Sequence, residues 1–164
     1  MEKGEIDAMS NLDPVISQLE ATGKFVAVAD SRTEKGMTEI YGGDYLASCI
    51  YASEDFVKKN PNTTQAVVNA MVKASRWIAK ATPEQIMAAV PEAYMAGNRS
   101  VYKAALLKNM VGYSPDGQLN MKAAQNVYKV LKQFEPSVIA AGSSINLAAT
   151  FDNGFAQKAA AKFK

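Results

Sequence analysis

The residues best suited to binding chemistry stand near the start of the chain, in the stretch GEIDAMSNLDP, residues 4–14. Its apolar part, residues 6–9, suits a buried strand, and Ser10, Asn11 and Asp13 follow directly, before a proline that suits a helix start. A helix N-terminus carries unpaired N–H groups and a partial positive charge, so it can hold an anion or a polar ligand. In open α/β sheets, ligands also lie off the carboxyl ends of strands. This corner is therefore a predicted ligand site.

The same three side chains could instead act only as helix caps. The residue pattern alone favours capping, partly because the negative charge of Asp13 would compete with a bound anion. Both interpretations stay open from the sequence.

A second candidate is the stretch YGGDY, residues 41–45. Gly42 and Gly43 can adopt a positive φ and let a ligand approach the backbone, while Tyr45 supplies a stacking face and a hydroxyl group. The stretch lacks the glycine framework and the Lys-Ser or Lys-Thr pair of phosphate-binding loops. A tight turn with packed tyrosines is as good an interpretation as a ligand contact.

The composition excludes several kinds of active site. The chain has no histidine and one cysteine, Cys49. Disulfides within the chain, Ser–His and Cys–His nucleophile pairs and the usual soft metal ligands are therefore ruled out. Two carboxylate pairs, Asp7 with Asp13 and Glu54 with Asp55, could do acid–base work, but nothing in the sequence buries or pairs them. We expect no catalytic residue, no metal and no cofactor.

Length and composition indicate one globular unit or part of a larger one. The 164 residues are 48% apolar and 21% charged, and the 18 basic and 16 acidic residues are scattered, so no nucleic-acid surface is visible. No apolar run approaches the roughly 20 residues that cross a bilayer. Residues 1–4 lack the pattern of a secretory signal, although a signal could have been removed. Lys158, Lys162 and Lys164 suit the last turn of a helix.

The elements that would position these sites begin as an α/β pattern. Residues 6–9 and 25–29 suit short buried strands, and the helix between them would complete a parallel β-α-β unit. Residues 45–52, YLASCIYA, suit a third strand that is apolar on both faces and therefore buried in a sheet. Cys49 inside it is expected to be a small buried hydrophobe rather than a reactive thiol.

After Ser53 the pattern is helical almost throughout. Three short strands cannot make a well-covered parallel sheet alone, so either the fold is a small sheet with many helices, or partner strands lie on sequence outside this chain. The patterns predict helices over 61–81 and 99–110, a capping box over Thr82–Gln85, a turn over 114–117, a helix that Pro136 ends and a last helix that Asp152 caps. The first helix has an apolar face made of Val67, Val68, Met71, Ala74, Trp77 and Ile78.

Several stretches, taken in order, resemble one protein family. They are GEIDAMSNLDPVISQLE, YGGDYLASCIYASEDFVKKNPNTTQAVVNAMVKASRWI, TPEQIMAAVPEAY, SPDG and ATFDNGFAQKA. Together they are similar to the C-terminal half of ABC-transporter substrate-binding proteins of the nitrate, sulfonate and taurine type. The likeness runs over essentially the whole chain.

This resemblance implies an α/β fold of the periplasmic-binding-protein type II kind, with two lobes around a ligand cleft. The chain would be a helix-rich C-terminal fragment of it with few strands. Residues 1–42 would close the second lobe, and residues 43–164 would form the return crossing and the helical cover of the first lobe. The N-terminal half would precede Met1, which accounts for the missing partner strands.

The resemblance also implies a function. The protein would be the periplasmic solute-binding component of an ABC importer and not an enzyme, made as a precursor with a signal peptide. It would capture a small, sulfonate- or nitrate-like anion by lobe closure and deliver it to membrane permease subunits, without inserting in the membrane or binding nucleic acid. The implied ligand-binding residues are Ser10, Asn11 and Asp13 on a loop facing the cleft, and Gly42, Gly43 and Tyr45 near the hinge.

Two other functions stay open. A thiamin-pyrimidine-synthase-like enzyme would share this fold, but its chemistry depends on histidine, which the chain lacks. A helical interaction module without a small ligand would fold alone as a stable monomer, whereas half of a two-lobed protein would expose sheet edges.

Overall fold

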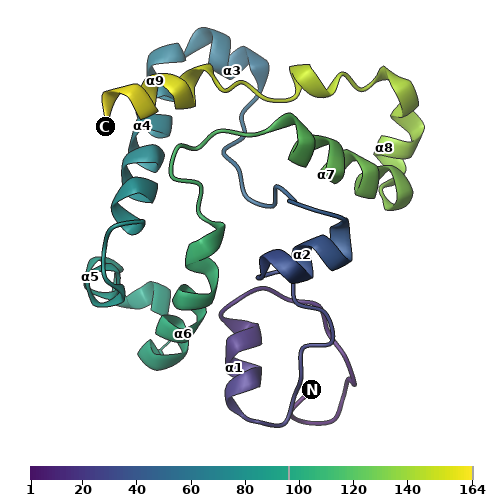
Figure 1. Cartoon of the computed structure of the whole chain (residues 1–164), viewed down its shortest axis with the longest axis vertical. Helices are drawn as coiled ribbons and strands as arrows, with labels where there is room; N and C mark the ends of the chain where they lie inside the picture. The colour runs from purple at the N-terminus through teal and green to yellow at the C-terminus, as the bar shows by residue number, and fades with distance from the viewer. Residues whose placement is uncertain (96, 164) are drawn as a thin grey trace. The chain divides into compact units, whose positions relative to one another are not determined.

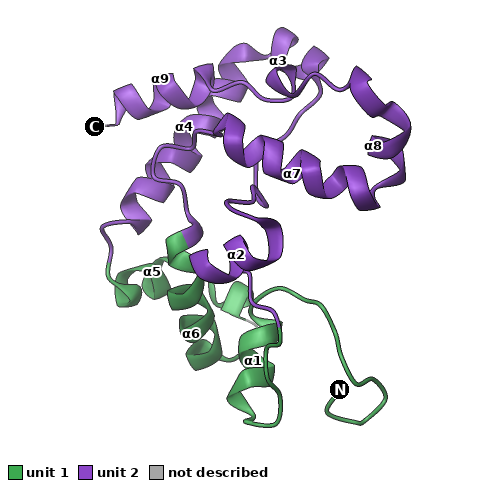
Figure 2. Cartoon of the chain, turned by 45° about the vertical axis from the view of Figure 1, so that its right-hand side comes forward, with its two compact units in different colours: residues 1–28, 82–111 green, residues 29–81, 112–164 purple. Residues whose placement is uncertain are grey.

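The regular structure of the chain is helical (Figure 1). The structure, a computed structural model, describes residues 1–95 and 97–163, so the predicted position of Lys164 lies outside the described residues. Within the described residues the chain forms two compact units, which Figure 2 shows in two colours. Unit 1 comprises residues 1–28 and 82–111, and unit 2 comprises residues 29–81 and 112–164.

Unit 1 is built from three α-helices, in which α6 packs against both α1 and α5. The helices are α1 (Val15–Ala21), α5 (Pro83–Ala89) and α6 (Arg99–Asn109), with a 3-10 turn at Glu92–Met95. The small core is apolar except for one buried hydroxyl group, that of Ser17, which is 5% exposed. The buried apolar side chains are those of Ile86, Met87, Met95, Ala105 and Leu106.

The helix starts in unit 1 follow local capping chemistry. At α5 the predicted capping box is confirmed, because Gln85 N–H donates to Thr82 Oγ1 at 3.2 Å and Thr82 N–H donates to Gln85 Oε1 at 2.8 Å. At α6 the Asn98 Oδ1 accepts the N–H of Val101 at 3.1 Å, so the predicted helix start near residue 99 is also confirmed.

Unit 2 is organised around the packing of α4 (Pro61–Ile78) against α9 (Gly154–Lys162). Val72 on α4 and Ala156 and Ala159 on α9 are buried. Gln65 Nε2 donates to the carbonyl oxygen of Phe155 at 2.9 Å, and Arg76 donates to the carbonyl oxygen of Phe163, which closes the end of α9. Polar bonds at both ends therefore align the two helices around an apolar centre.

The other helices of unit 2 are connected by caps and loop bonds. They are α2 (Glu34–Tyr41), α3 (Glu54–Lys59), α7 (Met121–Phe134) and α8 (Pro136–Ala141), with 3-10 turns at Gly142–Ser144 and Leu147–Ala149. The predicted end of α7 before Pro136 is confirmed, and that proline begins the next helix. Asn153 exchanges two hydrogen bonds with the backbone of Leu119, at 2.9 and 2.8 Å, and so fixes the approach to α7.

The three predicted strands do not form among the described residues. The stretches 6–9, 25–29 and 45–52 carry neither helix nor strand, although α1 lies between the first two as expected. Strand structure requires a second backbone to complete the ladder of hydrogen bonds, and none of these stretches pairs with another described segment. The described residues therefore do not show the predicted α/β fold, although its helix-rich character is confirmed.

Burial also departs from the prediction in two places. Cys49 is exposed rather than buried, because the stretch around it has no sheet to enter. On α4 the predicted apolar face stays largely open: Val67 is 47% exposed, Met71 51% and Trp77 44%. The helix is amphipathic as predicted, but α9 covers a different side of it.

Candidate functional site

The predicted ligand corner lies in unit 1, just before α1. Ser10 and Asn11 are both exposed and lie outside any helix. Asn11 Oδ1 accepts the N–H of Leu12 at 2.8 Å, a local bond that leaves its amide nitrogen free to donate. The corner therefore presents one hydroxyl and one carboxamide group to solvent.

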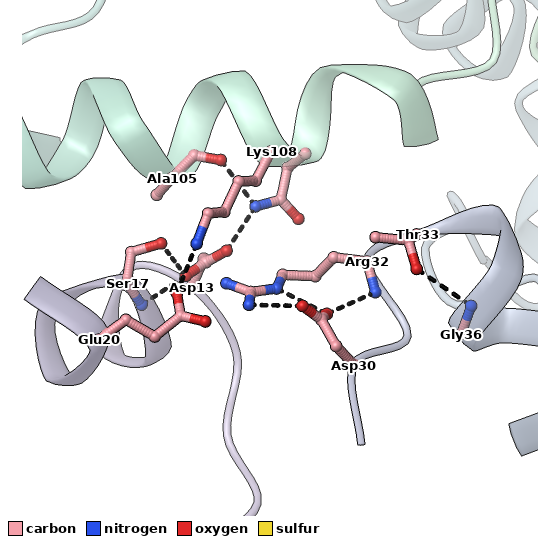
Figure 3. A network of polar contacts seen from close by, with 10 residues as sticks. Asp13, Ser17, Glu20, Asp30, Arg32, Thr33, Gly36, Ala105 and Lys108 are labelled. Carbon is pink, nitrogen blue, oxygen red and sulfur yellow. Dashed lines mark hydrogen bonds and ion pairs between the residues drawn. The ribbon is translucent and has the colours of Figure 1, made fainter. Parts of the chain in front are cut away.

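Asp13 has a different place in the same corner (Figure 3). Its Oδ1 accepts the N–H of Ser17 at 2.9 Å and the Ser17 hydroxyl at 2.7 Å, and its Oδ2 accepts from Asn109 Nδ2 at 2.7 Å. The first two bonds close the start of α1, and the third ties α1 to α6. Asp13 thus closes the start of α1 and bridges it to α6, whereas no hydrogen bond is seen from Ser10 or Asn11 to a backbone N–H of α1.

A second bond joins the same two helices further along. Lys108 Nζ on α6 lies 2.5 Å from Glu20 Oε2 on α1. Asn109 Nδ2 also donates to the carbonyl oxygen of Ala105 at 2.8 Å, which fixes the carboxamide that reaches Asp13. Two side chains from adjacent positions of α6 therefore hold α1 in place.

The first backbone N–H groups of α1 are already satisfied. Val15 and Ile16 donate to the carbonyl oxygen of Leu12 at 3.1 and 3.4 Å, and Ser17 donates to Asp13. A helix N-terminus binds an anion through such groups only while they are unpaired. The N–H groups of Val15, Ile16 and Ser17 are therefore not free to bind an anion.

The second candidate, residues 41–45, forms a tight turn in unit 2. Gly42 ends α2 in the left-handed region, with φ of 80°, and its N–H donates to the Thr38 carbonyl at 2.8 Å. Gly43 follows with φ of 147°, a conformation that also favours glycine. The rings of Tyr41 and Tyr45 stack with centroids 4.2 Å apart. The tyrosine faces therefore pack on each other.

Sequence reasoning did not identify Asn126, which fixes this turn. Asn126 lies on α7, and its Nδ2 donates to the carbonyl oxygens of Gly43 at 3.2 Å and Asp44 at 3.1 Å. A side-chain carbon added at Gly42 or Gly43 would lie 3.9 Å from its carboxamide. One sequence feature could have indicated this role. Asn126 follows the buried Ala123 by three residues, so the two lie on the same, packed side of the helix.

A polar cluster before α2 positions the start of that helix (Figure 3). Arg32 Nε and Nη2 donate to the two carboxylate oxygens of Asp30 at 2.8 and 2.7 Å, and the N–H of Arg32 donates to the same carboxylate at 3.0 Å. Thr33 Oγ1 accepts the N–H of Gly36 at 3.0 Å and caps α2. Gly36 packs so tightly that an added side-chain carbon would lie 1.8 Å from the Asp30 carbonyl oxygen.

Unit 1 has a shallow, open depression of about 320 Å³ between α5 and α6. Its two cations are both paired: Lys103 Nζ lies 2.6 Å from Glu84 Oε1, which also lines the depression, and Arg99 pairs with Glu92, which does not. The hydrogen bond from Lys103 lowers the pKa of the Glu84 carboxyl below its ordinary value. Both ion pairs are exposed to solvent.

The described residues hold neither a cluster of metal ligands nor a helix that could cross a membrane. No group of three or more His, Cys, Asp or Glu side chains among them could hold a metal ion. None of the described helices combines the length and the apolar composition that crossing a bilayer requires.

A protein family and a solved structure both match the chain. The NMT1-like family matches residues 1–92, a range that includes both candidate sites. A solved structure of a protein from Bordetella bronchiseptica RB50 superposes with a TM-score of 0.90 and is 43% identical in sequence; the match covers 99% of this chain and 50% of that one. The chain thus spans half the length of that relative. A search of curated proteins finds no match.

Proposed function

This chain belongs to the NMT1-like family, and from that premise we propose that it is part of the solute-binding component of an ABC importer. The family belongs to the nitrate/sulfonate/taurine-binding protein group, which indicates a solute-binding role outside the cytoplasm. The observation that carries the proposal is the match over residues 1–92. The proposed ligand is a small organic or inorganic anion of the sulfonate or nitrate class.

In this proposal the chain is the C-terminal half of a protein with two α/β lobes. Support comes from the solved relative, which is twice as long and 43% identical over this chain. The three apolar stretches that fail to form strands here would pair with strands of the other half. Residues 1–42 would complete one lobe and residues 43–164 the other.

The candidate residues divide into two roles. Ser10 and Asn11 would donate to the ligand through a hydroxyl and a carboxamide group, both exposed in this structure. Asp13 would hold the corner without touching the ligand, since both of its carboxylate oxygens already accept hydrogen bonds within unit 1. Gly42, Gly43 and Tyr45 would form a turn at the hinge between the lobes.

Binding would occur without turnover. A ligand closes two lobes when its affinity for the closed state exceeds its affinity for the open state. The closed protein would then deliver the anion to permease subunits in the membrane from the periplasm. The proposal needs no cofactor and no catalytic residue.

Calorimetry on the two-lobed protein tests the proposal. Titration with nitrate, taurine and methanesulfonate should give saturable heat for at least one anion. Ser10→Ala and Asn11→Ala should weaken that binding about fivefold or more while leaving the free energy of unfolding nearly unchanged, because neither side chain is buried. Asp7→Asn, an exposed change in the same segment, is the control. No heat with any of the anions would contradict the ligand class, and equal losses of binding and stability would contradict the site.

A further inference from the structure

Basic residues that are scattered along the sequence gather in unit 2. Unit 2 has 13 Lys and Arg residues and 9 Asp and Glu residues, whereas unit 1 has 5 and 7. The stretches 56–83 and 153–164, which include α4 and α9, contain no acidic residue at all. The positive charge of the chain is therefore concentrated on unit 2 and around these two helices.

The helices α4 and α9 lie side by side and run in the same direction (Figure 1). Gln65, near the start of α4, bonds to the carbonyl oxygen of Phe155 at the start of α9. Arg76, near the end of α4, bonds to that of Phe163 just past the end of α9. The buried Val72 of α4 lies between these two positions and marks the side that faces α9.

Four lysines share one side of this helix pair. At about 100° per residue, Lys73 and Lys80 lie about 60–80° around α4 from the contact residue Gln65. On α9, Lys158 and Lys162 lie about 90–130° from the side marked by the buried alanines, in the opposite sense of rotation. Because the helices are parallel, opposite senses of rotation lead to the same side of the pair. These four lysines are called the basic face.

The basic face has no internal source of negative charge. All four lysines are exposed, and among the described residues none of them forms an ion pair. The nearest acidic residues along the adjoining loops are Asp116 and Asp152, and both accept local N–H donors. Like charges four residues apart on a helix repel each other, so a partner that supplies negative charge would relieve this repulsion.

Aromatic rings lie beside the lysines. Trp77 is 44% exposed and lies within one helical turn of both Lys73 and Lys80. On α9, the Nζ atoms of Lys158 and Lys162 lie 5.8 and 5.6 Å from the ring centres of Phe155 and Phe163. Lysines combined with aromatic rings are typical of helices on membrane surfaces, where ammonium groups meet lipid phosphates and rings lie at headgroup level.

The chemistry of the basic face favours a lipid surface over a specific protein partner. Arg76 is the one arginine of α4 and α9, and it already bonds to the carbonyl oxygens of Pro115 and Phe163. Bidentate recognition of a carboxylate requires a free guanidinium group. Lysine ammonium groups act as point charges without a fixed geometry, which suits a layer of mobile phosphate headgroups.

We infer that the basic face adsorbs the protein reversibly to membranes that contain anionic phospholipids. Nucleic acid would offer the same charge, and the choice of lipid rests on the proposed function, which locates the protein outside the cytoplasm. Adsorption would involve the headgroups alone and would hold the protein close to its membrane permease. Because the attraction is electrostatic, it would weaken as the salt concentration rises.

Flotation with phospholipid vesicles tests the inference. Vesicles of phosphatidylcholine with about one-third phosphatidylglycerol should bind at least about tenfold more of the chain than phosphatidylcholine alone, and about 0.5 M salt should remove the difference. The emission of Trp77, the one tryptophan, should shift to shorter wavelength on binding. The two-lobed protein should bind in the same way, because burial of unpaired lysines against its other half would be costly.

Matched variants separate the basic face from net charge. Lys73→Glu and Lys158→Glu should each weaken binding to the anionic vesicles about fivefold or more. Lys129→Glu, which makes the same change of charge at an exposed position on α7, should weaken it less than about twofold. Circular dichroism of each variant checks that its helices are retained, and all three changes are at exposed side chains.

Four outcomes would overturn the inference. Equal binding to neutral and anionic vesicles would exclude the headgroup charge, and an equal effect of Lys129→Glu would assign binding to net charge. Tighter binding to an oligonucleotide than to the vesicles would assign the basic face to nucleic acid. Binding by the isolated chain that the two-lobed protein lacks would show that the other half covers the face. Calorimetry with nitrate, taurine and methanesulfonate is independent of these results, so a failure of adsorption is distinguishable from a failure of the proposed function.

Discussion

Asn126 donates through one nitrogen atom to the carbonyl oxygens of Gly43 and Asp44, at 3.2 and 3.1 Å, and so joins α7 to a turn 83 residues earlier in the chain. The turn follows the left-handed end of α2, and the amide of Tyr45 just after it lies 3.1 Å from Met37 Sδ. The path from α2 into residues 46–52 is therefore held by a carboxamide on a distant helix and by the sulfur atom of Met37.

Replacing Asn126 tests this link. Asn126→Ala removes both hydrogen bonds, and we expect it to lower the free energy of unfolding by about 1–2 kcal/mol. Gln125→Ala, an exposed change on the same helix, should cost less than about 0.5 kcal/mol. Urea denaturation followed by circular dichroism measures both, and equal values for the two variants would show that the carboxamide does not hold the turn.

Gly36 gives the largest expected effect among the glycines. In Gly36→Ala the added carbon would lie 1.8 Å from the Asp30 carbonyl oxygen, so the start of α2 must move. We expect a loss of about 3 kcal/mol or more. Gly112→Ala is the matched control, since its added carbon meets no atom within 4 Å. Similar thermal midpoints for the two variants would mean that the close approach is absent in solution.

Asp13 should matter for stability rather than for ligand contact. Asp13→Ala leaves the buried Ser17 hydroxyl and the Asn109 carboxamide without their acceptor, at a cost of about 2–3 kcal/mol. Asp7→Ala, which changes an exposed carboxylate in the same segment, should be nearly neutral. Denaturation curves of both variants decide this, and a neutral Asp13→Ala would reopen the carboxylate as a ligand group.

Asp116 makes stability depend on pH. The N–H of Gln118 donates to this carboxylate and is the main cause that lowers the Asp116 pKa below its ordinary value of 3.8; partial burial opposes the shift, and bonds from the Ser114 hydroxyl and the Gln118 side chain add to it. A lowered folded-state pKa adds stability that is fully present above 3.8 and is lost as the pH falls through the folded value.

Asp116→Asn should therefore destabilise the protein by about 0.5–1 kcal/mol at neutral pH, and the difference should shrink as the solution becomes acidic. Urea midpoints measured across that pH range, with Asp7→Asn as the control, check the sign. A difference that stays constant down to the acid end would exclude the carboxylate charge as the cause.

The sequence predicts those parts of the fold that depend on neighbours along the chain. The Thr82 cap, the helix starts at Pro61 and Arg99 and the end of α7 before Pro136 all rest on residues within four positions of each other, and all four are confirmed. The glycine that ends the predicted turn over 114–117 has a positive φ of 70°. At the last helix, Asp152 Oδ1 accepts the N–H of Gly154 at 2.7 Å, although Asn153 holds the cap position.

Features that depend on distant partners could not be predicted in the same way. The apolar pattern of residues 45–52 favours a buried strand. A strand, however, needs a second backbone to pair with, and no described residue forms such a pair with this stretch. The short helices α2, α3 and α8 are too brief for a periodic signal. The bond from Asn126 to the turn at Gly43 spans 83 residues and has no local pattern.

Whether Ser10, Asn11 and Asp13 bind a ligand stays a prediction, but the structure separates their surroundings. Ser10 and Asn11 are exposed, as a ligand contact requires, whereas Asp13 serves the packing of α1 on α6. The three residues are close together in the sequence. Only the structure shows that Ser17 and Asn109 bond to Asp13 and not to Ser10 or Asn11. The same residue types serve as helix caps and as ligand contacts, so composition and spacing alone could not tell which of the two roles each residue has.

The unpaired backbone of residues 46–52 also affects how long the chain survives in a cell. Proteases bind their substrates as extended strands through backbone hydrogen bonds, and residues 46–52 leave such bonds unmade. The first cut should therefore fall there, between α2 and α3, and would separate residues 1–45 from the helices that follow. Any partner strand that occupies the segment would block this cleavage, so the abundance of the chain would follow that of its partner.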